Sequence, residues 1–319
     1  MPALQCARKD LFRPRPRVGL PGSRRFSTAV IVGAVDFAVV DEDTGTAKRM
    51  ITVLWGAATD PGQVRTLNED SFLAQLPVFV VADGMGGHAA GEVASGLAID
   101  EFRQFVGADD LTVDDVAAAL GRANAAIVSG ASDADDKLGM GTTAAGLVMV
   151  HAAGGQHWMV FNIGDSRVYR FAEGQLDQVS IDHSEVEELV AAGQISRTQA
   201  RRHQRRNIVT RSLGTQPAPV ADSWLLPPVA GERYLVCSDG LPTELDDPEI
   251  AAYLGGEWDA QTAARRLVER AVAVGGRDNI TVLVVDVVDD DRTAVDEDTI
   301  PRAQAIAAAA DGLRESADE

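Results

Sequence analysis

The stretch LPVFVVADGMGGH, residues 76–88, joins an apolar run to an aspartate set among glycines. Its β-branched and aromatic part predicts a buried strand at 78–82, with Asp83 where the strand ends. The same order recurs in YLVCSDG, residues 234–240, and it is reversed in GGRDNITVLVV, residues 275–285. Buried strands that end at carboxylates indicate a site for hard cations, which prefer oxygen ligands.

An ordinary turn is the alternative for each of these aspartates, because Asp-Gly is a common turn signal. The pair Asp311-Gly312 near the end of the chain is interpreted in that way. Several such aspartates after apolar strands, with Asn68-Glu69-Asp70 upstream, favour the cation site. The five histidines show no metal-ligand spacing and no cysteine cluster accompanies the acids, so Mg²⁺ or Mn²⁺ is expected rather than Zn²⁺.

A pair of such ions would define the chemistry of the site. Two ions about 4 Å apart, bridged by one carboxylate, would lower the pKa of a shared water enough to give hydroxide near neutral pH. Hydroxide produced in this way suits in-line attack on a phosphoryl group.

Composition describes an ordinary globular core with an acidic surface. Hydrophobic residues make up 45% of the 319 and charged residues 24%, which suits a packed domain. The formal net charge of −19 argues against nucleic acid and anionic membranes as partners, because phosphates attract Lys and Arg. No run of about eighteen apolar residues is present, so no membrane span is predicted. The two cysteines, Cys6 and Cys237, make a disulfide framework unexpected and fit a reducing cytoplasm.

The sequence divides into a core domain at 50–288 and two flanking segments. Residues 1–49 are predicted to be a disordered extension, because 8–25 is basic and carries prolines. A signal peptide is the alternative there, and Asp36 within the apolar stretch that follows argues against it. Residues 289–319 are acidic and alanine-rich, and they are predicted to be a mobile tail.

Apolar patterning across the core domain predicts neighbouring runs of strands and pairs of helices. The strands are expected at 51–55, 78–82, 142–151, 156–162, 167–171, 233–237 and 280–288. The helices are expected at 90–106, 113–128, 184–192, 197–203, 248–254 and 260–274. Strands that follow one another directly favour antiparallel sheets covered by helices over a βαβ repeat.

Six short motifs occur in order through this domain. They are Asn68-Glu69-Asp70, ADGMGGH at 82–88, GMGTT at 139–143, NIGDSR at 162–167, CSDG at 237–240 and GRDN at 276–279. Over residues 51–288 the chain thereby resembles the bacterial 2C-type metal-dependent Ser/Thr protein phosphatases, the PPM family. The resemblance implies an α+β fold: a four-layer α-β-β-α sandwich of two antiparallel sheets flanked by helices.

By this resemblance, several residues would hold a pair of catalytic Mn²⁺ or Mg²⁺ ions. Asp83 would bridge the two ions, and Gly84 would offer its backbone carbonyl to the second. Asp239 and Asp278 would complete the ligand set of the first ion.

Four further residues are placed around the ions by the same resemblance. Glu69 and Asp70 would orient ion-bound waters. Arg65 matches the arginine that holds the substrate phosphate, a role that suits a guanidinium fork, and a solvated surface arginine is the alternative. His88 would either protonate the leaving oxygen as a general acid or order the glycine loop at a helix start.

The resemblance also implies a looser third ion and a mobile flap. Asp136 and Asp182 match the third site, with Asp239 shared, and a solvated acidic loop is the alternative for Asp136. Residues 184–214 resemble the flap, which carries several arginines in an otherwise acidic protein. The flap is expected to meet acidic phosphopeptides and set substrate choice. A solvated helix face with local ion pairs is the alternative for any single arginine.

The remaining motif residues are interpreted as structural. Gly141-Thr142-Thr143 and Asp165-Ser166-Arg167 are expected to form turns and buried hydroxyls that hold the sheets near the ions. Cys237 is expected to be a small buried hydrophobe rather than a nucleophile. Pro242 stands where Ser or Thr is common in the family, and it affects loop rigidity rather than the chemistry.

The predicted activity is hydrolysis of phosphoserine and phosphothreonine on proteins by water, in a cytoplasmic monomer of a signalling pathway. Its partners would be phosphorylated substrates of Ser/Thr kinases. One alternative is a non-catalytic pseudophosphatase, which lost ligand acids would mark and which the intact set disfavours. Another is a phosphatase of small phosphate esters, which the sequence distinguishes poorly because specificity lies in loops.

Overall fold

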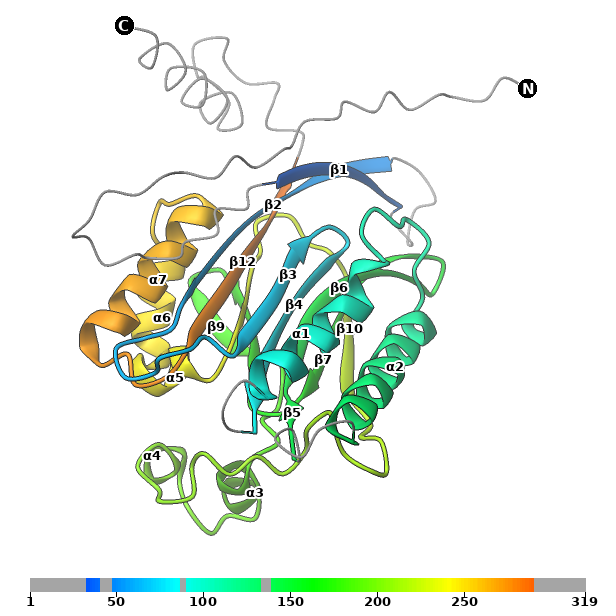
Figure 1. Ribbon diagram of the computed structural model, residues 1–319. Coiled ribbons are helices and arrows are strands. Elements are labelled where there is room, and N and C mark those ends of the chain that lie inside the picture. The colour runs from blue at the N-terminus through cyan, green and yellow to red at the C-terminus, as the bar shows by residue number, and fades with distance from the viewer. Residues whose placement is uncertain (1–32, 41–47, 87–89, 133–138, 290–319) are drawn as a thin grey trace, which may run out of the picture.

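Two antiparallel sheets lie face to face at the centre of the molecule (Figure 1). The computed structural model describes residues 33–40, 48–86, 90–132 and 139–289. The first sheet has the strand order β1 (Gly33–Val40), β2 (Lys48–Asp60), β12 (Ile280–Asp289), β11 (Arg233–Cys237), β8 (Arg167–Ala172) and β9 (Gln175–Gln178). The second has the order β10 (Asp222–Leu226), β7 (Gly155–Ile163), β6 (Ala144–Ala152), β4 (Val78–Met85) and β3 (Asp70–Gln75), with β5 (Gly141–Thr142) paired to β4.

Helices cover both outer faces of this sheet pair. The second sheet packs against α1 (Ala90–Arg103) and α2 (Val113–Ser132). The first sheet packs against α5 (Gly240–Glu244), α6 (Asp247–Leu254) and α7 (Ala260–Val274). The four layers follow one another across Figure 1, and they confirm the predicted α-β-β-α sandwich. No helix in the described ranges is long and apolar enough to cross a membrane.

Both faces of β12 are buried, which explains the uninterrupted apolar run in its sequence. Leu283 and Val285 lie in the core between the two sheets, whereas Val282 and Val284 lie in the core under the helices. Successive side chains of a strand point to opposite faces, and here both faces are covered. The strand is therefore held in the middle of the sandwich, and the residues just before it are fixed with it.

The α7 helix confirms its predicted bounds, 260–274. Its N-cap residue Asp259 accepts a hydrogen bond from the Thr262 backbone N–H at 2.6 Å, which satisfies one of the free donors at a helix start. Leu267 and Ala271 are among its fully buried residues, so the apolar face predicted from the helical period packs on the first sheet.

The N-terminal segment corrects one prediction. Residues 33–40 form β1, an edge strand whose register with β2 runs from Gly33↔Trp55 to Val40↔Lys48. The prediction that all of 1–49 is disordered is therefore wrong for 33–40 and for 48–49. A single acid such as Asp36 does not exclude a strand, because alternate positions of an edge strand face different surroundings. Residues 1–32 and the predicted tail beyond Asp289 lie outside the described residues.

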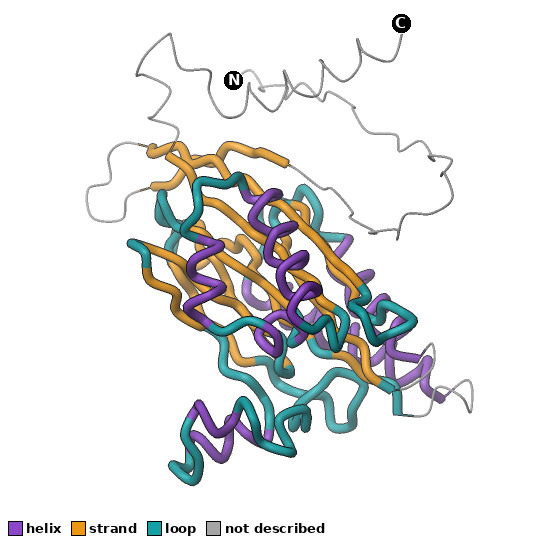
Figure 2. The backbone as a smooth tube through the Cα atoms, turned by 90° about the vertical axis from the view of Figure 1, so that its left-hand side faces the viewer, coloured by secondary structure: helices purple, strands orange, loops and turns teal. Residues whose placement is uncertain are grey.

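The flap, residues 184–214, projects from one end of the sandwich (Figure 2). It contains α3 (Glu185–Ala191) and α4 (Arg197–Ala200), and neither helix has a buried residue. The α4 helix is shorter than the predicted 197–203. Ser196 and Gln199 form a capping box at its start, which holds one helical turn without a packed core.

Candidate metal centre

Strand ends bring four of the predicted ligands to one end of the sandwich. Asp83 lies in β4 directly opposite Asp70 in β3. Asp239 follows β11, and Asp278 precedes β12, which pairs with β11 through Cys237↔Val282. The centre therefore draws on both sheets, and segments about 200 residues apart in sequence meet there.

Glycines let the backbone close around this centre. A Cβ on Gly84 would stand 2.1 Å from the Gly91 carbonyl oxygen and 2.7 Å from that of Glu69. A Cβ on Gly91 would stand 2.4 Å from Glu69 Oε1. The glycine after Asp83 is therefore required by packing against the first turn of α1, and it does more than form a turn.

Hydroxyl groups hold the acidic strands in place. Asp70 Oδ2 accepts hydrogen bonds from Ser238 Oγ and Thr281 Oγ1, both at 2.7 Å. The Asp83 backbone N–H donates to Thr143 Oγ1 at 2.9 Å, and Thr143 Oγ1 lies 2.7 Å from Ser166 Oγ. The structural role predicted for the threonine motif fits these contacts.

Burial of several carboxylates together shifts their ionisation. Burial, opposed by the bonds from Thr281 and Ser238 and reinforced by Asp239 and Asp278, raises the pKa of Asp70 to about 7. Burial and then Asp278 raise the pKa of Asp239 to about 6. Burial, followed by Asp70 and Asp239, raises the pKa of Asp83 well above its usual value. Charged carboxylates at this density need a compensating cation.

The donor set fits hard divalent cations. Asp70 Oδ1 and Glu69 Oε1 are buried and have no hydrogen-bond partner, although buried acceptors are normally satisfied. No three acidic, histidine or cysteine side chains among the described residues are arranged to hold an ion unaided. Backbone oxygen and water would have to complete each ion's ligands, as is usual for Mg²⁺.

Arg65 reaches the same end of the sandwich. Its Nη2 donates to Asp278 Oδ2 at 2.8 Å, and its side chain is 48% exposed. That hydrogen bond raises the pKa of the Arg65 guanidinium. The structure thus places the predicted phosphate-binding arginine against a predicted metal ligand, and its part in holding phosphate stays a prediction.

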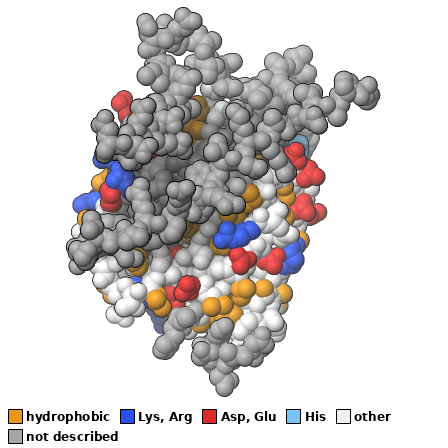
Figure 3. Space-filling view, turned by 45° about the horizontal axis from the view of Figure 1, so that its top comes forward, with side chains coloured by type: hydrophobic (Ala, Val, Ile, Leu, Met, Phe, Trp, Pro, Cys, Tyr) orange, Lys and Arg blue, Asp and Glu red, His pale blue; other side chains and the backbone are white. Residues whose placement is uncertain are grey.

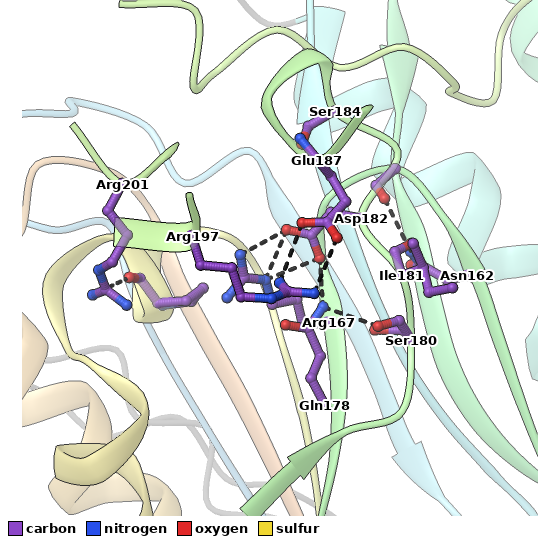
Figure 4. Close-up of polar contacts among 12 residues, drawn as sticks. Asn162, Arg167, Gln178, Ser180, Ile181, Asp182, Ser184, Glu187, Arg197 and Arg201 are labelled. Atoms are coloured by element: carbon purple, nitrogen blue, oxygen red, sulfur yellow. Dashed lines mark hydrogen bonds and ion pairs between the residues drawn. The ribbon is translucent and has the colours of Figure 1, made fainter. Parts of the chain in front are cut away.

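The predicted third site is described only in part. Both oxygens of Asp182 accept hydrogen bonds from Arg167, the shortest at 2.6 Å, and Oδ1 also accepts from Gln178 at 2.7 Å (Figure 4). Asp182 is therefore already neutralised by an arginine, which competes with an ion for its oxygens. Asp136 and His88 lie outside the described residues, so their roles stay predictions.

Asp165 lies with Asp70, Asp83, Asp239 and Asp278 in one group of interacting acids, the acid cluster. The sequence interpretation took Asp165 as structural. Its side chain is buried. Burial, then Asp239 and Asp182, raises the pKa of Asp165 well above its usual value. The signal was available: Asp165 follows Gly164 at the end of a buried strand, the pattern that identified Asp83.

The chain is thus a two-sheet sandwich with a cluster of buried carboxylates at one end, an arrangement that suits divalent cations. Residues 63–273 match the family described as Protein phosphatase 2C. The chain belongs to the protein phosphatase 2C family, and the resemblance drawn from the six motifs is confirmed.

Relatives and solved structures agree with this assignment. The serine/threonine protein phosphatase PstP of Mycobacterium tuberculosis is 40% identical over 250 residues, which are 77% of this chain and 47% of PstP. This chain thus spans about half the length of that relative. The serine/threonine phosphatase stp of Listeria monocytogenes is 34% identical over 72% of this chain and 93% of its own length. A crystal structure of the PstP catalytic domain with 2 manganese ions has a TM-score of 0.66 and 36% identity, covering 75% of this chain and 100% of that one.

Proposed function

We propose that this protein hydrolyses phosphoserine and phosphothreonine on proteins, at a centre that holds two Mn²⁺ or Mg²⁺ ions. The observation that carries the proposal is the buried carboxylate cluster with unsatisfied oxygens on Asp70 and Glu69. The printed names of the relatives, serine/threonine phosphatases, and the two manganese ions of the PstP structure support the substrate class and the metal.

Each acidic residue of the centre would have a distinct role in the reaction. Asp83, Asp239 and Asp278 would hold the ions, with the Gly84 carbonyl as a backbone ligand. Bound ions would supply Lewis acidity and lower the pKa of a water molecule toward neutrality. Asp70, fixed by two hydroxyl donors, would orient water.

Arg65 would receive the phosphate group of the substrate. Its side chain is 48% exposed beside the buried acids, so a ligand can reach it from solvent. A guanidinium fork can bond two phosphate oxygens at once. Binding of phosphate there would exchange one anionic partner, Asp278, for another.

A cysteine nucleophile does not fit the site. Cys237 is fully buried in β11, and burial raises the pKa of its thiol. The thiol therefore stays protonated at neutral pH, whereas attack requires the thiolate. Water is the nucleophile consistent with these contacts.

The decisive assay compares phosphoserine, phosphothreonine and phosphotyrosine versions of one peptide, with Mn²⁺ and with EDTA. Release of phosphate from the serine and threonine peptides, only with Mn²⁺, is expected. A sugar phosphate tested in parallel separates protein substrates from small esters. Phosphopeptide binding without turnover would identify a pseudophosphatase, and preference for the sugar phosphate would identify a small-ester phosphatase.

The setting and partners belong to the same proposal. The proposed substrates are proteins phosphorylated by Ser/Thr kinases, and the protein would act on them as a cytoplasmic monomer. The net charge of −19 and the free thiol of Cys237 are consistent with this setting. A protein of this charge repels nucleic acid and anionic membranes. Light scattering that gives the mass of a dimer would contradict the monomer.

A further inference from the structure

A cavity of about 430 Å³ is lined by residues of both the flap and the sandwich. One wall comes from the flap and includes Arg201, Arg202 and Arg206. The sandwich contributes Asp165 and Asp239 of the acid cluster to the lining. The cavity therefore opens onto the candidate metal centre, so that a peptide bound at the centre has the cavity beside it.

Three of the arginines that line the cavity already have carboxylate partners. The pairs are Arg167 with Asp182 at 2.6 Å, Arg197 with Glu187 at 3.2 Å and Arg277 with Glu244 at 2.9 Å. Figure 4 shows the first two pairs side by side. Their charges are locally compensated, so they add little attraction for an outside anion.

The other three arginines have no carboxylate partner among the described residues. Arg201 donates to the backbone carbonyls of Pro242 at 3.1 Å and Leu245 at 3.0 Å, which carry no net charge. Arg202 and Arg206 make no side-chain hydrogen bond or ion pair within the part of the chain that the structure describes, and both are exposed. Among the lining residues that the structure describes, Asp247 is the one carboxylate outside the ion pairs and the acid cluster.

This surplus of positive charge contrasts with the rest of the protein. The whole chain carries a net charge of −19, and Figure 3 shows charges of both signs among apolar side chains outside the grey atoms. Neighbouring positive side chains repel one another, and an anion between them relieves that repulsion. Arginine suits carboxylate and phosphate equally well, because both present two oxygens to its fork.

Arg201 links the flap to α5 by hydrogen bonds. The carbonyls that it bonds belong to α5 and to the residue after it. The α5 helix begins directly after Asp239. An arginine from the flap thus satisfies free carbonyls at a helix end, and it holds the basic wall at a set place relative to a predicted metal ligand.

We propose that this cavity is a subsite for a second anionic group of the substrate, bound by Arg202 and Arg206 beside the reacting phosphate. The group is a carboxylate or a phosphate a few residues away from the phosphorylated side chain. This inference rests on the proposed phosphatase function and deepens it, because it makes acidic or multiply phosphorylated segments the preferred substrates.

The test compares three phosphothreonine peptides that differ only in flanking residues: glutamine, glutamate or phosphoserine. Wild-type protein is expected to show a kcat/KM for the glutamate peptide roughly 3- to 10-fold above the glutamine peptide, mainly through KM, as two partly exposed ion pairs would give. The Arg202→Gln/Arg206→Gln variant should bring this ratio close to one. Whether the phosphoserine peptide exceeds the glutamate peptide tells which anion the subsite prefers.

Arg205→Gln is the matched control. Arg205 lies in the same segment, but it pairs with Glu185 and does not line the cavity. Its variant should keep the wild-type ratio, and circular dichroism should show all variants folded. Equal ratios in wild type and the double variant would overturn the subsite.

A peptide-binding assay tests the subsite even if no peptide is hydrolysed. Absence of hydrolysis of every peptide with Mn²⁺ would refute the phosphatase proposal. Fluorescence anisotropy of the labelled peptides would still measure the subsite, with tighter binding of the glutamate peptide expected in wild type and lost in the double variant. Equal anisotropy titrations for both proteins would reject it.

Discussion

The acid cluster is built on the ends of strands in both sheets, whereas the flap beside it has two short helices without a buried residue. In the cluster, the sheets hold Asp70 and Asp83 together against their mutual repulsion. In the flap, positive side chains sit on the surface and touch the sandwich through contacts such as those of Arg201. The core thus bears an electrostatic cost that a cation would relieve, whereas α3 and α4 of the flap are positioned without buried side chains.

Removal of the central acid tests this contrast most strongly. Asp83→Asn should lower phosphopeptide hydrolysis at least about 10³-fold. Without the carboxylate proposed to bridge the two metal ions, the reaction would lose several kcal/mol of transition-state stabilisation. The same change should raise the melting temperature of the metal-free protein, since it removes one charge from a buried acidic cluster.

Asp177→Asn provides the control, since Asp177 is exposed in β9. It should leave hydrolysis and melting temperature unchanged. Near-normal turnover by Asp83→Asn, or a lower melting temperature of its metal-free form, would contradict the placement of Asp83 at the centre.

The pH dependence of stability should reveal the cost of the cluster. The pKa values of Asp70 and Asp239 are raised to about 7 and about 6 in the folded protein. Between pH 4 and 7 the unfolded chain therefore releases protons that the folded chain keeps, so the free energy of unfolding falls as pH rises. For Asp70 alone the loss is up to about 4 kcal/mol.

Thermal melts at pH 5.5 and pH 8, with EDTA and with Mn²⁺, measure this effect. The metal-free protein should melt at a lower temperature at pH 8, and Mn²⁺ should raise the melting temperature more at pH 8 than at pH 5.5. A metal-free melting temperature that rises from pH 5.5 to 8 would refute the assignment of a repulsive cluster.

The hydroxyl donors to Asp70 should have a smaller effect. Ser238→Ala removes one of the two bonds to Asp70 Oδ2 and should weaken Mn²⁺ binding about 10- to 100-fold, as loss of a group that orients a ligand does. Isothermal titration calorimetry measures this directly. Ser223→Ala, at an exposed position of β10, should bind Mn²⁺ like wild type, and an equal loss in both variants would remove the special role of Ser238.

Sequence patterns predicted antiparallel sheets covered by helices and acids at strand ends, because these depend on strong local signals, and the family resemblance implied the four-layer sandwich and the roles of the residues at the centre. The β11 strand and α7 were predicted with the observed bounds, 233–237 and 260–274. By contrast, β10 was missed, since the strand has only five residues and its apolar residues, Trp224, Leu225 and Leu226, are consecutive and do not alternate with polar ones. Asp165 matched the strand-end pattern that identified Asp83, and its proximity to Asp239 and Asp182 became evident only in the folded chain.

Pairing within the flap could not be predicted for a different reason. Arg197 bonds Glu187, ten residues earlier, and this contact depends on how α3 and α4 are turned relative to each other. Which arginines remain uncompensated is therefore a property of tertiary structure. The basic flap could be read from the sequence, but the cavity with Arg202 and Arg206 could not.

The smallest expected effect concerns the link between the two regions. Arg201→Gln removes the bonds to the carbonyls of Pro242 and Leu245. Because neither α3 nor α4 has a buried residue, the position of these helices should depend on such polar contacts, and amide hydrogen exchange at 185–207 should become faster. The free energy of unfolding of the sandwich should change by only about 1 kcal/mol, and KM for a phosphopeptide should rise a few-fold.

The control variant is Arg265→Gln, at an α7 position paired with Glu269, and it should leave exchange in the flap unchanged. If exchange in the flap is equally slow in both variants, the flap is held by its two backbone bridges, Ser184↔Val209 and Thr142↔Leu213, and the arginine link contributes nothing.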